Sequence, residues 1–309
     1  MSQRYPVKLM AALIVIALFV FLSPDLKLDA VSGTIHKDPL KQRQILKQHL
    51  DSLQAELDSG AHTFTIGFNP AMQYSIDQLC TYIPNPQNTH LYLERSTPIA
   101  TVESLPSSYT GYYTPVKSAG ACGGSWAVAS CGEFESVILK TDSVVVDLSE
   151  QQLISCNTLG YGCNGGDFLY DLFVNPGAML ESCFPYVGLD IPCIDTCPYP
   201  YQAQGWGYVD SSVDVPAVED IKNAIYTYGA VGASVFVDSY FQAYVSGVFS
   251  KCKKSIRYPN HCIQLVGWDD AKGAWLLKNS WGTGWGESGF MWIQYNCNLV
   301  GYKANYVIY

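Results

Sequence analysis

The sequence predicts an α+β fold with two lobes, a helical lobe followed by a β-rich lobe, behind a helical N-terminal region. Apolar helical segments come first, at residues 125–139 and 148–156, and short apolar or alternating runs separated by Gly, Asp and Asn dominate from residue 205 onward. Helices followed by strands are typical of α+β domains. The 309 residues, 48% of them hydrophobic and 15% charged, suffice for one large domain or two small ones. A ligand site is expected between the lobes.

The first 30 residues predict a secretory signal peptide. Arg4 and Lys8 precede an apolar run at residues 9–22, and more polar sequence begins with Ser23 and Pro24. A membrane anchor at residues 9–22 is the alternative, but a spanning helix needs roughly 20 apolar residues. We therefore expect a chain that enters the secretory pathway and is secreted or delivered to a lysosome or vacuole, without membrane attachment once the signal is removed.

The charge balance argues against nucleic-acid binding. A net charge of −9 and an isoelectric point near 4.9 leave no basic field to attract nucleic acid or anionic lipid. The sequence has no metal-ligand cluster, phosphate loop or nucleotide motif, so we expect no metal and no cofactor. Eleven cysteines in a secreted chain predict disulfides, and only Cys80 precedes residue 122.

Residues 31–104 predict a region separate from the main domain. Leu46, Leu50, Leu53 and Leu57 recur at helical spacing between residues 38 and 58, and Gly60 ends the pattern. An ordinary core-facing helix has the same spacing. A stretch rich in Pro, Asn, Thr and Ser from about residue 83 to 108 then predicts a linker, which places the main domain at residues 105–309.

Each lobe carries its own local signals. Residues 125–139 predict a largely buried helix, and Ser149 can cap a second helix that has Glu150 in its first turn. In the β lobe the expected strands lie in the runs GWGYVDSSVDV, GASVFVD, CIQLVGWDD, AWLLKNSWG and GFMWIQY.

Ser125 follows the turn ACGG and opens the first of these helices. Unpaired backbone N–H groups and the helix dipole favour a negative charge there, so a Cys would have a depressed pKa and form a thiolate. The hydroxyl of a Ser does not ionise so readily and needs a general base to take its proton. Without further context, a Ser that simply caps the helix is the commoner case.

A base and an orienting group are present in the β lobe. His261 heads an apolar strand in NHCIQLVGW, and Asn279 ends another in LLKNSWGTGWGESGF. An imidazole oriented by an amide can act as a general base, and Trp281 could shield the pair from water. Taken singly, each residue is more often structural, since a His at a strand start commonly only forms a hydrogen bond and a Trp commonly packs in the core.

Several ordered motifs resemble the papain-like cysteine peptidase family. The segment TPVKSAGACGGSW is similar to the family's TPVKNQGxCGSCW, GCNGG from Gly162 matches its glycine-rich cleft wall, NHCIQLVGW its His segment, and NSWGTGWGESGF its Asn-Ser-Trp block. With LSEQQLISC and FPY at Phe184, the matches cover roughly residues 105–309. The resemblance implies a papain-like fold, with a helical lobe, a β-barrel-like lobe and a peptide or protein ligand in the cleft between them.

The N-terminal region resembles the family's propeptide. FTIGFNPAMQYSIDQL from Phe64 is similar to a degenerate propeptide motif, which has an aromatic, a Gly, an Asn and then acidic residues at similar offsets. The helix before it would be the inhibitory prodomain helix, although the family's usual helix signature is mostly missing. The resemblance thus implies a zymogen with a helical prodomain.

The resemblance also assigns catalytic roles. It places Ser125 at the position of the nucleophilic Cys, His261 at that of the base, Asn279 at that of the orienting amide, and Trp281 at that of the shielding indole. Ala119 stands where the family has the Gln that helps to form the oxyanion hole. Loss of a nucleophile can cost up to about 10⁶ in turnover, and loss of one oxyanion donor roughly 10² to 10³. The backbone N–H of Ser125 remains as a donor, and Ser118 is a candidate for a second.

Disulfide pairing follows from the same resemblance. It implies three bridges, Cys122–Cys163 and Cys156–Cys193 in the helical lobe and Cys252–Cys297 in the β lobe. A further bridge between Cys131 and Cys183, or between Cys183 and Cys197, stays open. Cys262 adjoins His261 on a strand, so its side chain points to the opposite face and is expected to be buried.

The resemblance implies a substrate surface that is largely intact. Gly165 and Gly166 would lie beside the extended substrate backbone, where absent side chains permit close approach. The main specificity pocket would be lined by Asp167, Phe168, Phe236 and Tyr302, and the bulk of the last two would make it shallow.

These residues predict a catalytically impaired or inactive papain-family homologue that keeps a peptide-binding cleft. A lineage that had only exchanged its nucleophile would have no reason to lose the oxyanion Gln as well. An active Ser-His-Asn endopeptidase or esterase is the first alternative. An inactivated, engineered Cys-to-Ser form of a cysteine protease is the second, but it does not explain Ala119 or Gly124. A scaffold role without cleft function is a further reading.

Overall fold

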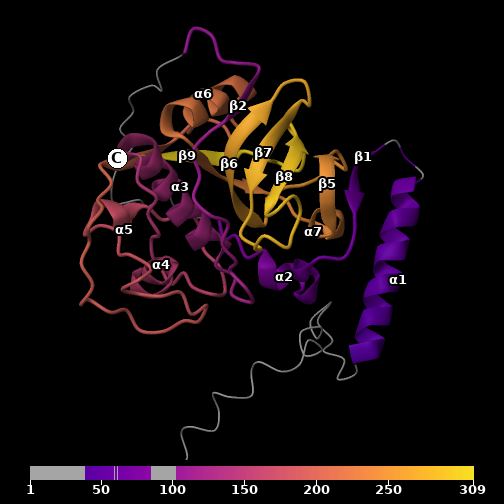
Figure 1. Cartoon of the computed structure of the whole chain (residues 1–309), viewed down its shortest axis with the longest axis horizontal. Helices are drawn as coiled ribbons and strands as arrows, with labels where there is room; N and C mark the ends of the chain where they lie inside the picture. Colours follow the sequence, from indigo (N-terminus) through magenta and orange to yellow (C-terminus); the bar gives the residue numbers. More distant parts are fainter. Residues whose placement is uncertain (1–38, 59, 61, 85–101) are drawn as a thin grey trace, which may run out of the picture.

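The computed structural model describes residues 39–58, 60, 62–84 and 102–309 (Figure 1). The predicted signal peptide and most of the predicted linker lie outside these residues. Within the described part, no helix is long and apolar enough to cross a membrane. The helices are α1 (Pro39–Asp58), α2 (Ile76–Leu79), α3 (Ser125–Asp142), α4 (Glu150–Cys156), α5 (Asp171–Val174), α6 (Val218–Tyr228) and α7 (Ser239–Gln242), with a 3₁₀ turn at Pro70–Gln73.

The strands of the described part form one sheet in the order β1-β5-β8-β7-β6-β4-β9-β3, with β2 paired to β6. Neighbouring strands are antiparallel except β5 and β8. Their bounds are β1 (Thr63–Ile66), β2 (Ser108–Thr110), β3 (Gly205–Tyr208), β4 (Val231–Val235), β5 (Tyr244–Phe249), β6 (His261–Asp269), β7 (Ala274–Lys278), β8 (Phe290–Gln294) and β9 (Tyr302–Ile308).

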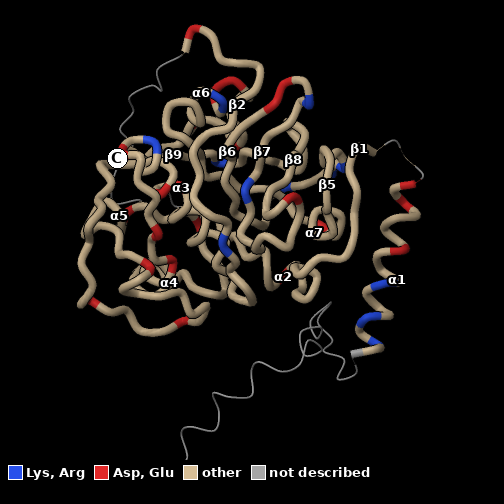
Figure 2. Tube along the Cα trace, viewed as in Figure 1, with Lys and Arg blue, Asp and Glu red and all other residues tan. Residues whose placement is uncertain are grey.

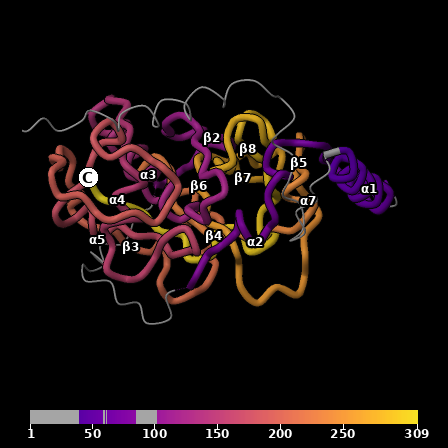
Figure 3. The backbone as a smooth tube through the Cα atoms, turned by 90° about the horizontal axis from the view of Figure 1, so that it is seen from below, coloured from indigo at the N-terminus to yellow at the C-terminus, as the bar shows by residue number. Residues whose placement is uncertain are grey.

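The two predicted lobes are confirmed. Helices α3, α4 and α5 lie at one end of the molecule and the strands β5 to β8 toward the other, as Figures 1 and 3 show from two directions. Each lobe has its own buried cluster, one centred on Trp126, Phe134 and Phe173 and the other on Trp268 and Trp275. Strand β6 contributes side chains to both clusters, because successive side chains of a strand point to opposite faces.

The predicted N-terminal helix is present as α1 and packs against the β lobe. Leu46, Leu53 and Leu57 are buried in the β-lobe cluster, and Leu50 packs against its edge. In Figure 2, Lys and Arg occupy the first half of α1 and Asp and Glu the second half, the reverse of what the helix dipole favours. Packing of the leucine face, and not the helix's own electrostatics, therefore stabilises it.

Two elements differ from the sequence expectation. Helix α6 lies in a region predicted to be β-rich, where Val218, Ile221 and Ile225 recur at helical spacing and Gly229 follows the last turn. Strand β2 begins at Ser108, inside the end of the predicted linker, and pairs with the far end of β6.

Four disulfides cross-link the chain. Cys122–Cys163 and Cys156–Cys193 lie in the helical lobe and Cys252–Cys297 in the β lobe, which are the three pairs that the family resemblance implies. The fourth, Cys183–Cys197, is one of the two alternatives for a further bridge. Cys80, Cys131 and Cys262 are free and buried.

Strand register positions the candidate site. Antiparallel pairing sets Val235 of β4 opposite His261 of β6, and Gln264 of β6 opposite Lys278, the last residue of β7. The start of β6 and the end of β7 therefore lie side by side, although about 18 residues of chain separate them. This register brings His261 to Asn279.

Candidate active site

Ser125 is the first residue of α3, and its hydroxyl is buried without a hydrogen-bond partner. Gly124 occupies the N-cap position and supplies no side chain, so Ser125 does not cap the helix and the simpler interpretation is wrong. The turn before it is held by the Cys122–Cys163 disulfide and by the Gly123 N–H, which donates to the Cys163 carbonyl at 2.8 Å. The hydroxyl is thus placed at the positive end of an 18-residue helix.

His261 and Asn279 form the predicted pair. The His261 Nε2 atom lies 2.8 Å from the Asn279 amide oxygen, and both residues are buried. An oxygen acceptor assigns the ring proton to Nε2, which leaves Nδ1 as the basic nitrogen of the neutral imidazole. Nδ1 has no hydrogen-bond partner.

Burial lowers the pKa of His261 to about 4. The Asn279 amide oxygen and the Leu79 backbone oppose this shift and offset it only in part. The imidazole is therefore neutral over most of the physiological pH range. A neutral imidazole can accept a proton but does not supply the positive charge that stabilises an anion beside it.

Trp281 covers the His261–Asn279 pair. The His261 and Trp281 ring centroids are 4.9 Å apart, and the indole is only 5% exposed. Phe241 and Trp285 pack edge-on against the same indole. The imidazole thus lies beside a packed group of aromatic rings.

The turn that precedes Ser125 offers few hydrogen-bond donors. The side chain of Ala119 is a methyl group, and its backbone N–H already donates to the Ser280 carbonyl at 2.9 Å. The Ser118 hydroxyl accepts from the Gly120 N–H at 3.3 Å, in its own turn. The Ser125 N–H, in the first turn of α3, has no partner within the helix.

A segment of the N-terminal region covers the surface that the family resemblance assigns to substrate. The Gly166 N–H donates to the Thr81 carbonyl at 3.3 Å, and the Ile83 N–H donates to the Gly166 carbonyl at 3.0 Å. On the β-lobe side, the Tyr82 N–H donates to the Asn260 carbonyl at 3.0 Å. Residues 81–83 are therefore hydrogen-bonded to both lobes.

The backbone of residues 81–83 comes so close to the helical lobe that position 165 requires a glycine. Its φ is +122°, and a Cβ atom there would lie 2.1 Å from the Thr81 carbonyl oxygen. Any side chain would push residues 81–83 away from the helical lobe.

The side chain of Tyr82 lies among residues that the family resemblance assigns to the specificity pocket. Phe168 and Tyr302 belong to the same buried cluster as Tyr82, and the Tyr302 ring meets it edge-on at 6.4 Å. Burial and, after it, the charge of Asp167 raise the pKa of Tyr82. Phe236 follows the end of β4, and the Lys253 ammonium lies 4.9 Å from its ring centroid.

Sequence reasoning did not pair Ser234 with Cys262, the neighbour of His261. They face each other across β4 and β6, with 3.9 Å between Ser234 Oγ and Cys262 Sγ, and both are fully buried. The signal that could have found them is the register that pairs the strand of His261 with GASVFVD, since it sets Ser234 beside the neighbour of His261.

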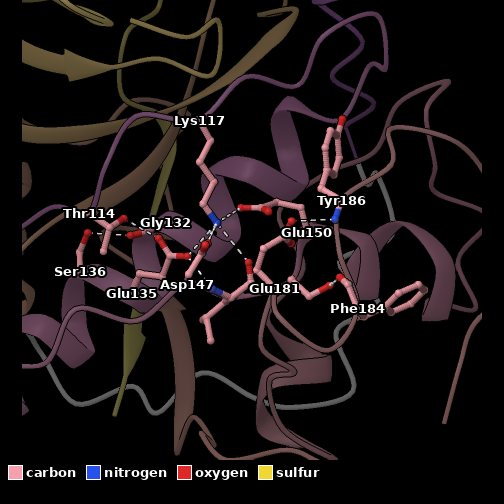
Figure 4. Close-up of polar contacts among 12 residues, drawn as sticks. Thr114, Lys117, Gly132, Glu135, Ser136, Asp147, Glu150, Glu181, Phe184 and Tyr186 are labelled. Atoms are coloured by element: carbon pink, nitrogen blue, oxygen red, sulfur yellow. Dashed lines mark hydrogen bonds and ion pairs between the residues drawn. The ribbon is translucent and has the colours of Figure 1, made fainter. Parts of the chain in front are cut away.

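A cluster of charged side chains around Lys117 lies next to the segments that carry the site residues (Figure 4). Lys117 forms ion pairs with Glu135 at 3.1 Å, Glu150 at 2.7 Å and Asp147 at 2.6 Å. Thr114 donates a hydrogen bond to Glu135 and accepts one from Lys278, which directly precedes Asn279. The cluster therefore connects α3 and α4 to the segment of Thr114 and Lys117 and to Lys278, the residue before Asn279.

Charges in this cluster shift each other's protonation. Burial raises the pKa of Glu150, a shift that Lys117 opposes, and burial lowers the pKa of Lys278 to about 8. Burial alone would lower the pKa of Lys117, but Glu150 and Glu135 outweigh it and raise the value. Since one ammonium serves several carboxylates, Lys117 stays charged and is the group that holds the cluster together.

Comparison with known proteins gives one consistent picture. A family profile described as papain family cysteine protease matches residues 105–309. Cathepsin K of Mus musculus is 30% identical over 294 residues, which cover 84% of this chain and 83% of that protein. Pro-cathepsin H of Bos taurus is 31% identical over 261 residues, which cover 79% and 76%.

Solved structures of precursor proteins show a similar fold. The recombinant stem bromelain precursor superposes with a TM-score of 0.73 at 25% identity, covering 89% of this chain and 94% of that one. Digestive procathepsin L2 from the larval midgut of Tenebrio molitor superposes with a TM-score of 0.76 at 24% identity, covering 90% and 96%. The likeness thus extends over the N-terminal region as well as the two lobes.

Proposed function

This chain belongs to the papain family of cysteine proteases, and we propose that it is a catalytically impaired or inactive member that keeps a peptide-binding cleft. The observation that carries the proposal is the Ser125 hydroxyl, buried and unpaired at the head of α3, where the family resemblance expects a nucleophilic Cys. The neighbouring Ala119, in place of the oxyanion Gln, supports the same conclusion.

The chemistry of this arrangement favours loss of activity. The family's attack uses a thiolate beside an imidazolium, whereas a serine hydroxyl does not ionise at a helix terminus. The low pKa of His261 also removes the positive charge that would balance an anion at residue 125. A tetrahedral adduct would then be stabilised by the Ser125 N–H without help from the side chain of Ala119.

One observation favours the second candidate, a serine-type peptidase or esterase. The neutral imidazole of His261 has its basic Nδ1 free, and that is the protonation state which a general base for Ser125 needs. The candidate requires Nδ1 to reach the hydroxyl and a second oxyanion donor to replace the missing amide. Ser118 does not supply that donor in its present position, because its hydroxyl accepts from Gly120.

We propose that residues 31–104 act as a prosegment of this protein. Support comes from the contacts of residues 81–83 with both lobes and from the precursor forms among the similar structures. Four disulfides favour an oxidising compartment, so we propose delivery through the secretory pathway to the exterior, a lysosome or a vacuole.

Covalent labelling of residue 125 tests the proposal. The full chain is treated with a serine-directed fluorophosphonate, and the peptide that contains residue 125 is analysed by mass spectrometry. We expect no labelling of Ser125 that depends on His261. The Ser125→Cys variant, treated with iodoacetamide, is the control for access, because alkylation of its thiol shows that a reagent reaches residue 125 past residues 81–83.

Labelling of the parent chain that disappears in both Ser125→Ala and His261→Ala would contradict the proposal and favour the serine-type enzyme. Labelling that persists in His261→Ala would show that the Ser125 hydroxyl reacts without His261 as its base. That result would agree with the proposed impaired site.

A further inference from the structure

Four cationic side chains lie close together in the loop between β5 and β6. They are Lys251, Lys253, Lys254 and Arg257. Residues 105–309 contain ten Lys and Arg against 18 Asp and Glu, yet residues 250–260 hold four of those cations and no acidic residue. The acidic net charge of the chain therefore does not exclude a local basic surface, which we call the basic loop (residues 250–260).

None of the four cations forms an ion pair within the part of the chain that the structure describes. Every other Lys side chain of residues 105–309 has an oxygen partner. Lys117, Lys222, Lys272 and Lys303 form ion pairs, Lys140 donates to backbone carbonyls, and Lys278 donates to Thr114. The unpaired positive charge of this domain is thus concentrated in the basic loop.

Asp238 is an acidic group that senses these charges without neutralising them. Burial raises the pKa of Asp238, and Lys253 and Lys251 oppose that shift. The Asp238 carboxylate caps α7, where it accepts from the N–H groups of Tyr240 and Phe241, each at 3.1 Å. It forms no ion pair with either lysine in the described part of the chain, so both ammonium groups can bind a further anion.

The basic loop is tied to the rest of the β lobe. The Cys252–Cys297 disulfide joins it to the segment before β9, and the Lys253 N–H donates to the Asn298 side-chain oxygen at 2.8 Å. A ligand that binds a loop held in this way loses less free energy in ordering it.

Two of the cations also lie over aromatic rings. The Lys251 ammonium is 4.7 Å from the ring centroid of Tyr240, and the Lys253 ammonium is 4.9 Å from that of Phe236. A ring face attracts a cation from one side and leaves its other side open to an anion. Lys253, Lys254 and Arg257 are exposed, and Lys251 is half-buried.

A linear polyanion fits this arrangement. Short segments rich in Lys and Arg are typical of surfaces that bind heparin or nucleic acid. The disulfide within the loop requires an oxidising compartment, where sulfated polysaccharides are the common polyanions and nucleic acids are not. An anionic membrane would also face the acidic remainder of the domain, whereas a single chain can contact the loop alone because salt screens charges beyond about 8 Å.

We propose that the basic loop binds a sulfated polysaccharide through Lys251, Lys253, Lys254 and Arg257. The inference goes beyond the proposed function, because binding requires neither a peptide in the cleft nor turnover at Ser125. The proposed secretory route enters only in the choice of a polysaccharide over nucleic acid.

Binding of heparin to the full chain tests the proposal, measured by isothermal titration calorimetry at several NaCl concentrations. The test variant combines Lys253→Gln, Lys254→Gln and Arg257→Gln. The matched control combines Lys47→Gln, Lys272→Gln and Lys303→Gln, which removes the same charge from cations that already have carboxylate partners.

We expect the test variant to bind heparin roughly 100-fold more weakly at low salt, since each cation near an anionic ligand contributes about fivefold. The slope of log K against log salt should become shallower by about 2. The control should stay within about threefold of the parent. In the parent, heparin should protect Lys251, Lys253 and Lys254 from acetylation, read by mass spectrometry, and leave Lys47, Lys272 and Lys303 reactive.

Absence of heparin binding at low salt, an equal loss in the control, or protection confined to lysines outside the loop would overturn the proposal. Unsulfated heparosan, polyglutamate and phosphatidylserine vesicles distinguish other anionic ligands. If any of these bound the parent as tightly as heparin, the assignment to a sulfated polysaccharide would be wrong. Because acetylation is mapped on the parent, the result does not depend on the folding of a variant.

Discussion

At the scale of single residues, the site combines two buried polar atoms that lack partners. The Ser125 hydroxyl and the Nδ1 atom of His261 are both unpaired, and a buried unpaired group costs about 1–3 kcal/mol. The side-chain nitrogens of Asn279 and Trp281 are unpaired in the same region. Such a concentration of unpaired polar atoms is typical of a site laid out for a ligand or a reaction, not of a core optimised for stability.

His261 provides a prediction at this scale. We expect its imidazole to titrate at about pH 4 in the folded full chain, because burial disfavours the charged ring. The unfolded state binds the proton near pH 6.5, so between pH 6.5 and 4 it holds more protons than the folded state. Acidification through that window should therefore lower the free energy of unfolding, by roughly 3 kcal/mol in total.

The measurement is an NMR titration of the imidazole C–H signals, assigned by their loss in His261→Gln, together with urea unfolding at pH 6.5 and pH 4. The difference in stability between the two pH values should shrink in His261→Gln. An imidazole that titrates near pH 6.5 would contradict the buried, neutral base.

At the scale of elements, the Lys117 cluster fastens the helical lobe to the loops of the site. Lys117 lies between the side chains of α3 and α4, and its carbonyl accepts from the Gly282 N–H at 3.0 Å. Ser118 forms a β-bridge with Trp281. Helix packing and site geometry are thus linked through one short segment of chain.

Lys117→Met should destabilise the protein by about 3–5 kcal/mol, because it leaves Glu135 and Glu150 buried without their cation. Urea unfolding at neutral pH measures this loss. Lys47→Met is the matched control, since Lys47 pairs with Asp51 on the exposed face of α1 and such pairs contribute little. A Lys117→Met variant as stable as the control would show that the cluster does not hold the lobes' elements together.

At the scale of the whole molecule, the fold could be predicted from the sequence because the patterns that indicate each helix and strand lie within single short segments. Helical spacing gave α1 and α3, the Ser149 cap marked the start of α4, and alternating runs marked the strands of the β lobe. Helix α6 was missed because it lies among strands and only 11 residues carry its pattern. The pairing of His261 with Asn279 came from the ordered motifs.

The contents of the pocket could not be predicted in this way. Tyr82 meets Gly166 through a β-bridge between segments more than 80 residues apart, and no local pattern encodes it. Phe236 was proposed as pocket lining from the family resemblance, and in the structure it follows the end of β4 and lies beside Lys253. Strand register, not composition, decides which side chains line a pocket.

The central claim is that the cleft is intact and only the chemistry at residue 125 is lost. The most direct test compares the full-length parent, Ser125→Ala and the double variant Ser125→Cys, Ala119→Gln after incubation at acidic pH, with chain length read by mass spectrometry. We predict that the parent and Ser125→Ala keep their starting mass, whereas the double variant removes its own N-terminal region ahead of residue 105. A parent chain that shortens itself while Ser125→Ala does not, or a double variant that stays at full length, would contradict the account.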